Sequence, residues 1–111
     1  MPHGSSPLGE FEVVVLLAAL HCAGSGTGVD IRAEIERRSR RKVGRGAVYV
    51  TLDRLNDKGL LTSRSGPASP ERGGHPRRFF TVTAAGLRAV KQSLATLERM
   101  RAGLDPVLGD R

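Results

Sequence analysis

The first long apolar stretch of the chain predicts a helix with little polar surface. Residues 8–22 contain eight consecutive apolar residues at 13–20 and are followed by a Gly- and Ser-rich break at 23–27. A helix that is apolar nearly all round must be covered on more than one side. A domain of this size has few elements to surround such a helix, so the pattern indicates that a partner chain supplies part of the cover.

The next stretch, residues 29–38, fits two kinds of element. Its apolar positions alternate with charged ones, as they do in a strand. Ile31 and Ile35 are also four residues apart, and the Arg, Ala and Glu between them favour helix. Thr27 is placed to cap the N-terminus of such a helix. We therefore expect a helix here, followed by a basic turn at 39–42.

The rest of the pattern predicts a third helix, a hairpin and a last helix. In order, these elements cover residues 45–58, 60–65, 78–82 and 84–103. Gly59 ends the third helix and Thr83 caps the last one. Residues 66–76 hold three Gly and three Pro. This composition is typical of an extended loop at the tip of the hairpin.

Three helices followed by a β-hairpin is the order of a winged helix-turn-helix domain. In that domain the third helix enters the DNA major groove and the hairpin forms the wing. The predicted fold class is therefore mainly α with a small β-hairpin. We assign the winged helix-turn-helix DNA-binding domain to residues 8–82 and a C-terminal dimerisation helix to residues 83–104. The flanking residues 1–7 and 105–111 are expected to be flexible.

Positive charge gathers in the middle of this 111-residue chain, whose length fits one domain. The net charge is +7, and residues 32–80 hold thirteen basic against five acidic residues, a local charge of +8. A basic segment between near-neutral ends favours a polyanion as partner.

Other features disfavour several classes of protein. The longest apolar run has eight residues, whereas a membrane-spanning helix needs about 20, so no membrane span is expected. The lone cysteine, Cys22, has no partner for an internal disulfide, so we expect a reducing, cytoplasmic location. The three histidines are scattered, and no spacing indicates a catalytic group or a metal site. We expect neither an enzyme nor a bound cofactor.

The third helix carries the residues expected to read DNA. Val48, Leu52 and Leu55 form its buried stripe. The start and far side of the helix should reach base edges or phosphates through Arg45, Gly46, Tyr49, Val50 and Arg54. An ordinary solvated helix with Tyr49 against the core remains an alternative. Asp53 and Asp57 favour that alternative, unless they hold Arg54 and Lys58 in place as helix neighbours.

The predicted wing concentrates positive charge on a flexible backbone. The residues expected to contact a phosphate ridge or the minor groove are Arg72, His75, Arg77 and Arg78. A solvated charged loop is the alternative. The further basic cluster at 37–42 is expected to be partly a phosphate contact and partly a solvated face.

The last helix repeats apolar residues at heptad spacing. Its stripe consists of Leu87, Val90, Leu94, Leu97 and Leu104, with Arg101 at the missing position. The stripe fits a helix packed on its own domain, or one packed across a two-fold axis. We favour a homodimer in which Leu87, Val90, Leu94 and Leu97 pack with Leu16, Leu17 and Leu20 of the first helix.

Four segments together resemble the PadR family of transcriptional regulators. They are LGEFEVVVLLAAL at 8–20, GVDIRAEIERRS at 28–39, GRGAVYVTLDRLNDKGLL at 44–61 and PERGGHPRRFFTVTAAG at 70–86. The specific feature is the combination of GAVYxTLxRLxxKGL with an ERGG wing and an FxxTxxG exit.

The resemblance implies a homodimeric bacterial repressor of the short subfamily, which has a single C-terminal helix. Tyr49 matches the family's recognition-helix tyrosine, and Phe80 takes the place of the aromatic residue in the second wing strand. The resemblance also implies a small hydrophobic effector at the dimer interface.

The expected function is therefore sequence-specific binding of double-stranded DNA at an inverted-repeat operator. Two alternatives belong to other classes. One is a basic RNA- or ribosome-associated protein, which exposed aromatic residues would favour. The other is a winged-helix module that binds another protein, which an apolar recognition face would favour.

Overall fold

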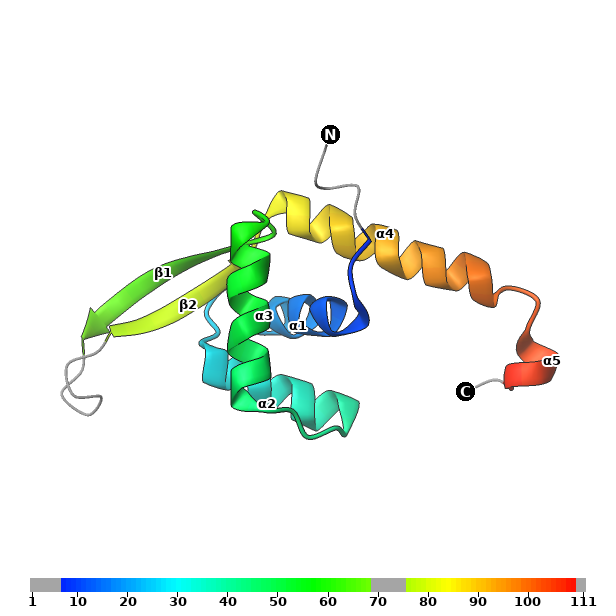
Figure 1. Cartoon of the computed structure of the whole chain (residues 1–111), viewed down its shortest axis with the longest axis horizontal. Helices are drawn as coiled ribbons and strands as arrows, with labels where there is room; N and C mark the ends of the chain where they lie inside the picture. The colour runs from blue at the N-terminus through cyan, green and yellow to red at the C-terminus, as the bar shows by residue number, and fades with distance from the viewer. Residues whose placement is uncertain (1–6, 69–75, 110–111) are drawn as a thin grey trace.

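The computed structural model describes residues 7–68 and 76–109 and confirms the predicted fold class. The chain is mainly helical with one antiparallel hairpin (Figure 1). The elements are α1 (Glu10–His21), α2 (Gly28–Ser39), α3 (Arg45–Asp57), β1 (Leu61–Ala68), β2 (Pro76–Val82), α4 (Ala84–Arg101) and α5 (Asp105–Leu108). The expectations for residues 1–6 and 110–111, and for Arg72 and His75 of the wing, fall outside the described residues.

The ambiguous stretch after the first helix is helical, as predicted. The Thr27 hydroxyl accepts a hydrogen bond from the Asp30 N–H at 3.2 Å, and the Asp30 carboxylate accepts one from the Thr27 N–H at 3.0 Å. This reciprocal capping box satisfies two backbone donors at the start of α2. Thr83 likewise caps α4, because its hydroxyl accepts from the Gly86 N–H at 3.0 Å.

Helix α1 takes most of its cover from its own chain, and the expected contribution of a partner chain stays a prediction. The helix lies at the centre of the domain and contacts α2, α3, α4 and β2 of its own chain. Val15, Leu16, Ala18 and Ala19 are buried there. Four elements that pack on one helix from different sides bury most of it even in a small domain, which the sequence pattern alone did not reveal, while Leu17 stays half-buried and Leu20 exposed.

The hairpin is longer than predicted and is anchored in the core at its base. Strand pairing runs from Leu61 opposite Val82 to Ser65 opposite Arg78, and resumes beyond a shift in register. Phe80 of β2 is completely buried, and its N–H donates to the Gly26 carbonyl at 3.0 Å. The base of the hairpin is therefore joined to the loop between α1 and α2.

The C-terminal part extends away from the domain. In Figure 1, α4 begins beside the hairpin, passes α1 and continues beyond it. Residues 105–111 were expected to be flexible throughout, but Asp105–Leu108 forms the short helix α5. The Arg101 guanidinium pairs with the Asp105 carboxylate at 2.6 Å across the turn between α4 and α5. This pair and the turn's own backbone hydrogen bonds order the segment.

The Glu12 carboxylate joins α1 to the end of α3. It accepts a hydrogen bond from the Lys58 ammonium at 2.8 Å and another from the Gly9 N–H at 2.9 Å. Burial raises the pKa of Glu12. The hydrogen bonds from Lys58 and Gly9, with the positive charges of Lys58 and Arg54, outweigh this effect and lower the pKa below its ordinary value.

We predict that Gly86→Ala destabilises the fold. A Cβ at Gly86 would overlap the Leu60 carbonyl oxygen and come within 2.9 Å of a Val82 methyl group. The free energy of unfolding in urea should fall by about 1–3 kcal/mol. The control is Gly46→Ala, also near a helix start, where a Cβ meets nothing within 4 Å. It should raise stability by up to about 1 kcal/mol. Equal stabilities for the two variants would contradict this packing.

A second prediction concerns how the free energy of unfolding changes as the pH falls. Because the folded pKa of Glu12 is below its unfolded value, the stabilisation is present at neutral pH. It is lost as the pH falls from the unfolded value through the folded one. At pH 7 the free energy of unfolding of Glu12→Gln should be about 1 kcal/mol below that of the wild type. On acidification this free energy should fall less in the variant than in the wild type. Urea titrations from pH 7 to pH 3 measure this. The control Glu98→Gln, which removes an exposed carboxylate, should follow the wild-type curve.

Candidate nucleic-acid interface

The outward face of α3 carries most of the residues predicted to meet DNA. Val48, Leu52 and Leu55 are completely buried, so the opposite side of the helix faces solvent. Gly46, Val50 and Arg54 are exposed on that side, and Arg45 is exposed at the N-terminal end of the helix. In Figure 1 this helix stands in front of the domain, between the hairpin and α2. The buried stripe thus sets which residues a partner meets.

The first turn of α3 is suited to an anion. It contains no acidic residue, and Gly44 at the N-cap supplies no side-chain hydrogen bond. The helix dipole therefore adds to the charge of Arg45 at this end. The space beside Gly46 is open, which permits close approach of a phosphate or a base edge.

Tyr49 does not project freely from α3. Its ring packs on the backbone of Gly28 at the start of α2, so closely that any Cβ at Gly28 would overlap it. The side chain is half-buried and touches the core. The glycine is therefore required for the close approach of α2 and α3. Contact between Tyr49 and a base stays a prediction, and the tyrosine has a packing role as well.

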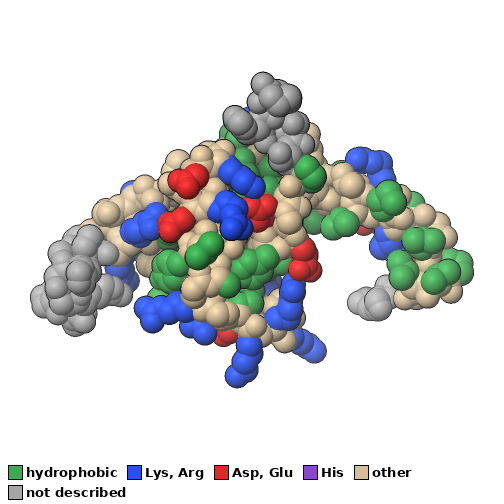
Figure 2. Space-filling model, viewed as in Figure 1, with side chains coloured by type: hydrophobic (Ala, Val, Ile, Leu, Met, Phe, Trp, Pro, Cys, Tyr) green, Lys and Arg blue, Asp and Glu red, His purple; other side chains and the backbone are tan. Residues whose placement is uncertain are grey.

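Much of the basic cluster at the end of α2 is neutralised by neighbouring acids. Arg37 and Arg38 both pair with Glu34, at 2.8 and 2.7 Å, and Arg41 pairs with Glu10 at 3.2 Å. The hydrogen bonds from Arg38 and Arg37 lower the pKa of Glu34. Figure 2 shows Lys and Arg side chains gathered below α3, over α2 and the turn that follows it. These ion pairs fit the solvated face that was expected for part of the cluster, and a phosphate contact by the rest of it stays a prediction.

The acidic residues of α3 are not paired as expected. Asp53 pairs with Arg78 of β2 at 3.3 Å, and Lys58 pairs with Glu12 at 2.8 Å. Asp57 makes no ion pair with any described residue. Asp53 and Lys58 therefore pair with residues of the hairpin and of α1, and not with their neighbours on α3.

The hairpin presents arginines on both of its faces. Arg78 lies over the Phe80 ring at 5.0 Å, and Arg64 lies over the Phe79 ring at 4.9 Å on the other face. Arg77 is exposed. Sequence reasoning missed Arg64, although its place in a strand opposite an aromatic residue was a usable signal.

The residues predicted for the dimer interface separate into two groups. Leu16 and Val90 are buried within the chain's own core, so they offer no surface to a second copy. Leu17 is half-buried, whereas the exposed members are Leu20, Leu87, Leu94 and Leu97. Sequence reasoning did not include Met100, Val107 and Leu108, which extend the exposed apolar surface onto α5.

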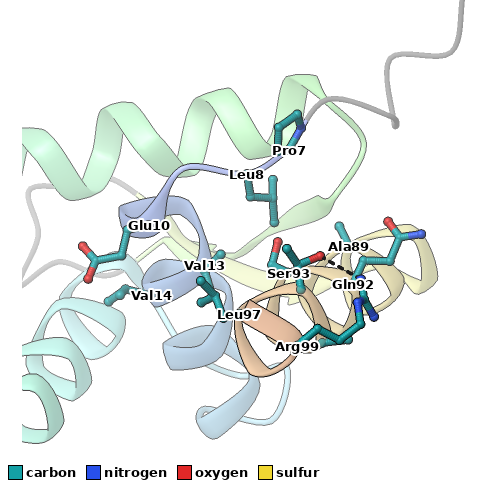
Figure 3. Close-up of a pocket in the computed structure, with 12 residues that line it drawn as sticks. Pro7, Leu8, Glu10, Val13, Val14, Ala89, Gln92, Ser93, Leu97 and Arg99 are labelled. Carbon is teal, nitrogen blue, oxygen red and sulfur yellow. Dashed lines mark hydrogen bonds between the residues drawn. The ribbon is translucent and has the colours of Figure 1, made fainter. Parts of the chain in front are cut away.

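A groove lies between the start of α1 and the outer part of α4 (Figure 3). Its volume is about 720 Å³. Leu8, Val13 and Val14 line one side, and Ala89 and Leu97 line the other. Polar residues also line the groove, among them Glu10, whose carboxylate pairs with Arg41.

No group of three or more His, Cys, Asp or Glu side chains among residues 7–68 and 76–109 is placed to hold a metal ion. Within the same residues, no helix combines the length and apolar character that crossing a membrane requires.

Burial and the nearby charges of Glu34 and Asp30 raise the pKa of the Cys22 thiol, which disfavours the reactive thiolate.

Solved structures share this fold. A PadR-like transcription factor from Bacteroides fragilis aligns with a TM-score of 0.71 and 21% identity, over 87% of this chain and 88% of that one. A PadR family regulator from Eggerthella lenta DSM 2243 gives 0.69 and 20%, over 92% and 88%. A winged-helix DNA-binding protein from STIV gives 0.69 and 14%, over 88% and 98%.

Of two comparisons of sequence, one gives a match. A search among curated proteins found no match. The model of the transcriptional regulator PadR-like family matches residues 16–92, which include α2, α3, the hairpin and the first half of α4. Since that match spans well over half of the chain, the protein belongs to the PadR-like family of transcriptional regulators and has its winged-helix DNA-binding fold.

Proposed function

We propose that the protein is a sequence-specific repressor that binds an inverted-repeat operator as a homodimer. The observation that carries the proposal is the acid-free first turn of α3. It presents Arg45 and Gly46 to solvent on a helix that is joined, through Asp53 and Arg78, to a hairpin that bears arginines. In winged helix-turn-helix proteins the start of this helix reaches base edges, and the hairpin lies against the backbone.

In this proposal the α3 residues divide by chemistry. Arg45 pairs with guanine or a phosphate, and the exposed Val50 meets a thymine methyl group. Gly46 lets the helix end approach closely. Arg54, about two turns along the helix from Gly46, contacts the backbone or a flanking base. Tyr49 supports the helix against Gly28, and the exposed part of its half-buried side chain contacts a base.

The wing anchors the complex without reading sequence. Arg77, with Arg72 and His75 from the loop outside the described residues, contacts phosphates or the minor groove. The same role suits Arg64, which the strand presents on the face away from Arg78.

The dimer uses the exposed apolar side of α4. Leu87, Leu94 and Leu97 are 40%, 44% and 63% exposed, an unusual amount of large apolar surface for one helix. Packing two copies about a two-fold axis covers it and places two α3 helices about 34–36 Å apart on one DNA face.

The groove of about 720 Å³ beside this surface is where we place the small hydrophobic effector, since ligand sites have similar volumes.

We predict salt-dependent, sequence-selective binding to duplex DNA. Selection from random duplexes should return an inverted repeat, and log–log plots of affinity against salt should be steep. Arg45→Ala should cost about 1–3 kcal/mol on the selected site and less on random DNA. Arg77→Ala should weaken both equally and lower the slope by about 0.9. An affinity for duplex DNA that does not change with salt concentration, or an equal affinity for duplex DNA and single-stranded RNA, would overturn the proposal.

The dimer is tested by Leu94→Glu. Because Leu94 is exposed in the single chain, the change should leave the fold intact and place an unpaired charge in the interface. Sedimentation at micromolar concentration should give a dimer for the wild type and a monomer for the variant, which also loses tight operator binding. The control Arg88→Glu, at another exposed position of α4, should stay dimeric. A wild-type monomer would refute the model.

A further inference from the structure

Arg77 and Arg78 are neighbours in sequence but occupy opposite faces of β2. Side chains alternate along a strand, so Arg78 lies on the same face as Phe80 and Arg77 on the other. Arg78 lies opposite Ser65 in the ladder, and Phe80 opposite Ser63. The face that Arg78 shares with Ser63 and Phe80 is the one turned toward α3, because its guanidinium reaches Asp53.

The Arg78 guanidinium is held on three sides. One terminal nitrogen donates to the Asp53 carboxylate at 3.3 Å, and the other donates to the Ser63 hydroxyl at 3.2 Å. Its central carbon lies 5.0 Å from the centroid of the completely buried Phe80 ring. One side chain thus joins α3, β1 and β2.

These contacts neutralise the charge that a phosphate anchor would need. A DNA phosphate would have to displace the Asp53 carboxylate, which lies on the proposed DNA-binding helix. Asp53 also repels DNA by itself, so its position there is unfavourable unless it has another role.

We propose that Arg78 is a positioning residue that fixes the wing against α3 through Asp53. The pair sets the angle between hairpin and helix, so that Arg45 on α3 and Arg77 on the wing meet the same DNA segment in register. The inference rests on the proposed function, because it assumes that both elements contact DNA. It replaces the expected phosphate-anchor role of Arg78.

Whether Asp53→Ala strengthens or weakens selective DNA binding tests the proposal better than the size of the change. Arg78 and Asp53 are 43% and 63% exposed, and an exposed ion pair changes an equilibrium by about fivefold at most. If Asp53 acts only as a negative charge, Asp53→Ala strengthens binding to every duplex. If it positions the wing, Asp53→Ala lowers the ratio of selected-site to random-DNA affinity by about twofold to fivefold.

The first experiment compares Asp53→Ala with Asp57→Ala in the full chain. Asp57 is the other acid of α3, one turn further along, and pairs with no described residue. We expect Asp57→Ala to strengthen binding to selected and random duplexes alike, and Asp53→Ala to reduce the selected-to-random ratio. If both variants strengthen binding equally, the proposal is wrong.

A double-mutant cycle then separates positioning from anchoring. Arg78→Ala should lower the selected-to-random ratio in the wild-type background and change it little in the Asp53→Ala background. Arg78→Lys should not restore the ratio, because an ammonium lacks the planar fork that meets Asp53 and Ser63 together. An equal loss from Arg78→Ala in both backgrounds would identify Arg78 as an independent phosphate contact and overturn the proposal.

A measurement on the DNA-free protein distinguishes failure of this proposal from failure of the proposed function. Side-chain ¹⁵Nε relaxation should show Arg78 more ordered than Arg77, and Asp53→Ala should loosen Arg78 while Asp57→Ala leaves it unchanged. An Arg78 side chain as mobile as Arg77 would refute the positioning role. A wild-type protein that binds no duplex would refute the proposed function, whatever the relaxation shows.

Discussion

The burial of Phe80 is the constraint on which the arrangement of the DNA-facing elements depends. Its ring fills the core at the base of the hairpin, and its backbone N–H is bonded to Gly26 between α1 and α2. Removing apolar surface of this size from water contributes about 1.5–3 kcal/mol. With the base of the wing fixed in this way, the strands can extend beyond the core and still keep a defined direction relative to α3.

Ion pairs refine that arrangement and decide which cations remain available. Glu10, Glu12 and Asp53 hold Arg41, Lys58 and Arg78 respectively, and each pair joins parts of the chain that are distant in sequence. The basic residues left without an ion pair to a described residue include Arg45 and Arg54 on α3. A net positive charge therefore does not distribute itself evenly over the surface. The acids hold some cations in structural contacts, while α3 presents others to solvent.

Helix α4 contributes to two kinds of packing along its length. Val90 and Gly86 near its start are buried against the domain, and Thr83 caps it while its hydroxyl donates to the Gly59 carbonyl. Further along, Leu97 and Met100 continue the apolar pattern and are 63% and 72% exposed in the described chain. The same periodicity thus supports internal packing first and, in our proposal, packing between copies afterwards.

Local sequence determined the order of the elements, their caps and the buried stripe of α3. Thr27 and Thr83 cap helices through neighbours three residues away, and helical periodicity alone places Val48, Leu52 and Leu55 on one face. Short-range chemistry of this kind is visible in sequence. The order of elements and the family motifs accordingly predicted the winged helix.

Contacts between distant residues were decided only by the tertiary structure. It placed Leu16 inside the core, set the Tyr49 ring on Gly28, and paired Asp53 with Arg78 rather than with its helix neighbour. Each of these outcomes depends on the angle at which one element crosses another. Periodicity identifies the apolar side of an element but not the surface that will cover it. For this reason the sequence indicated which residues carry charge, and the packing of the elements determined which of those charges are already paired.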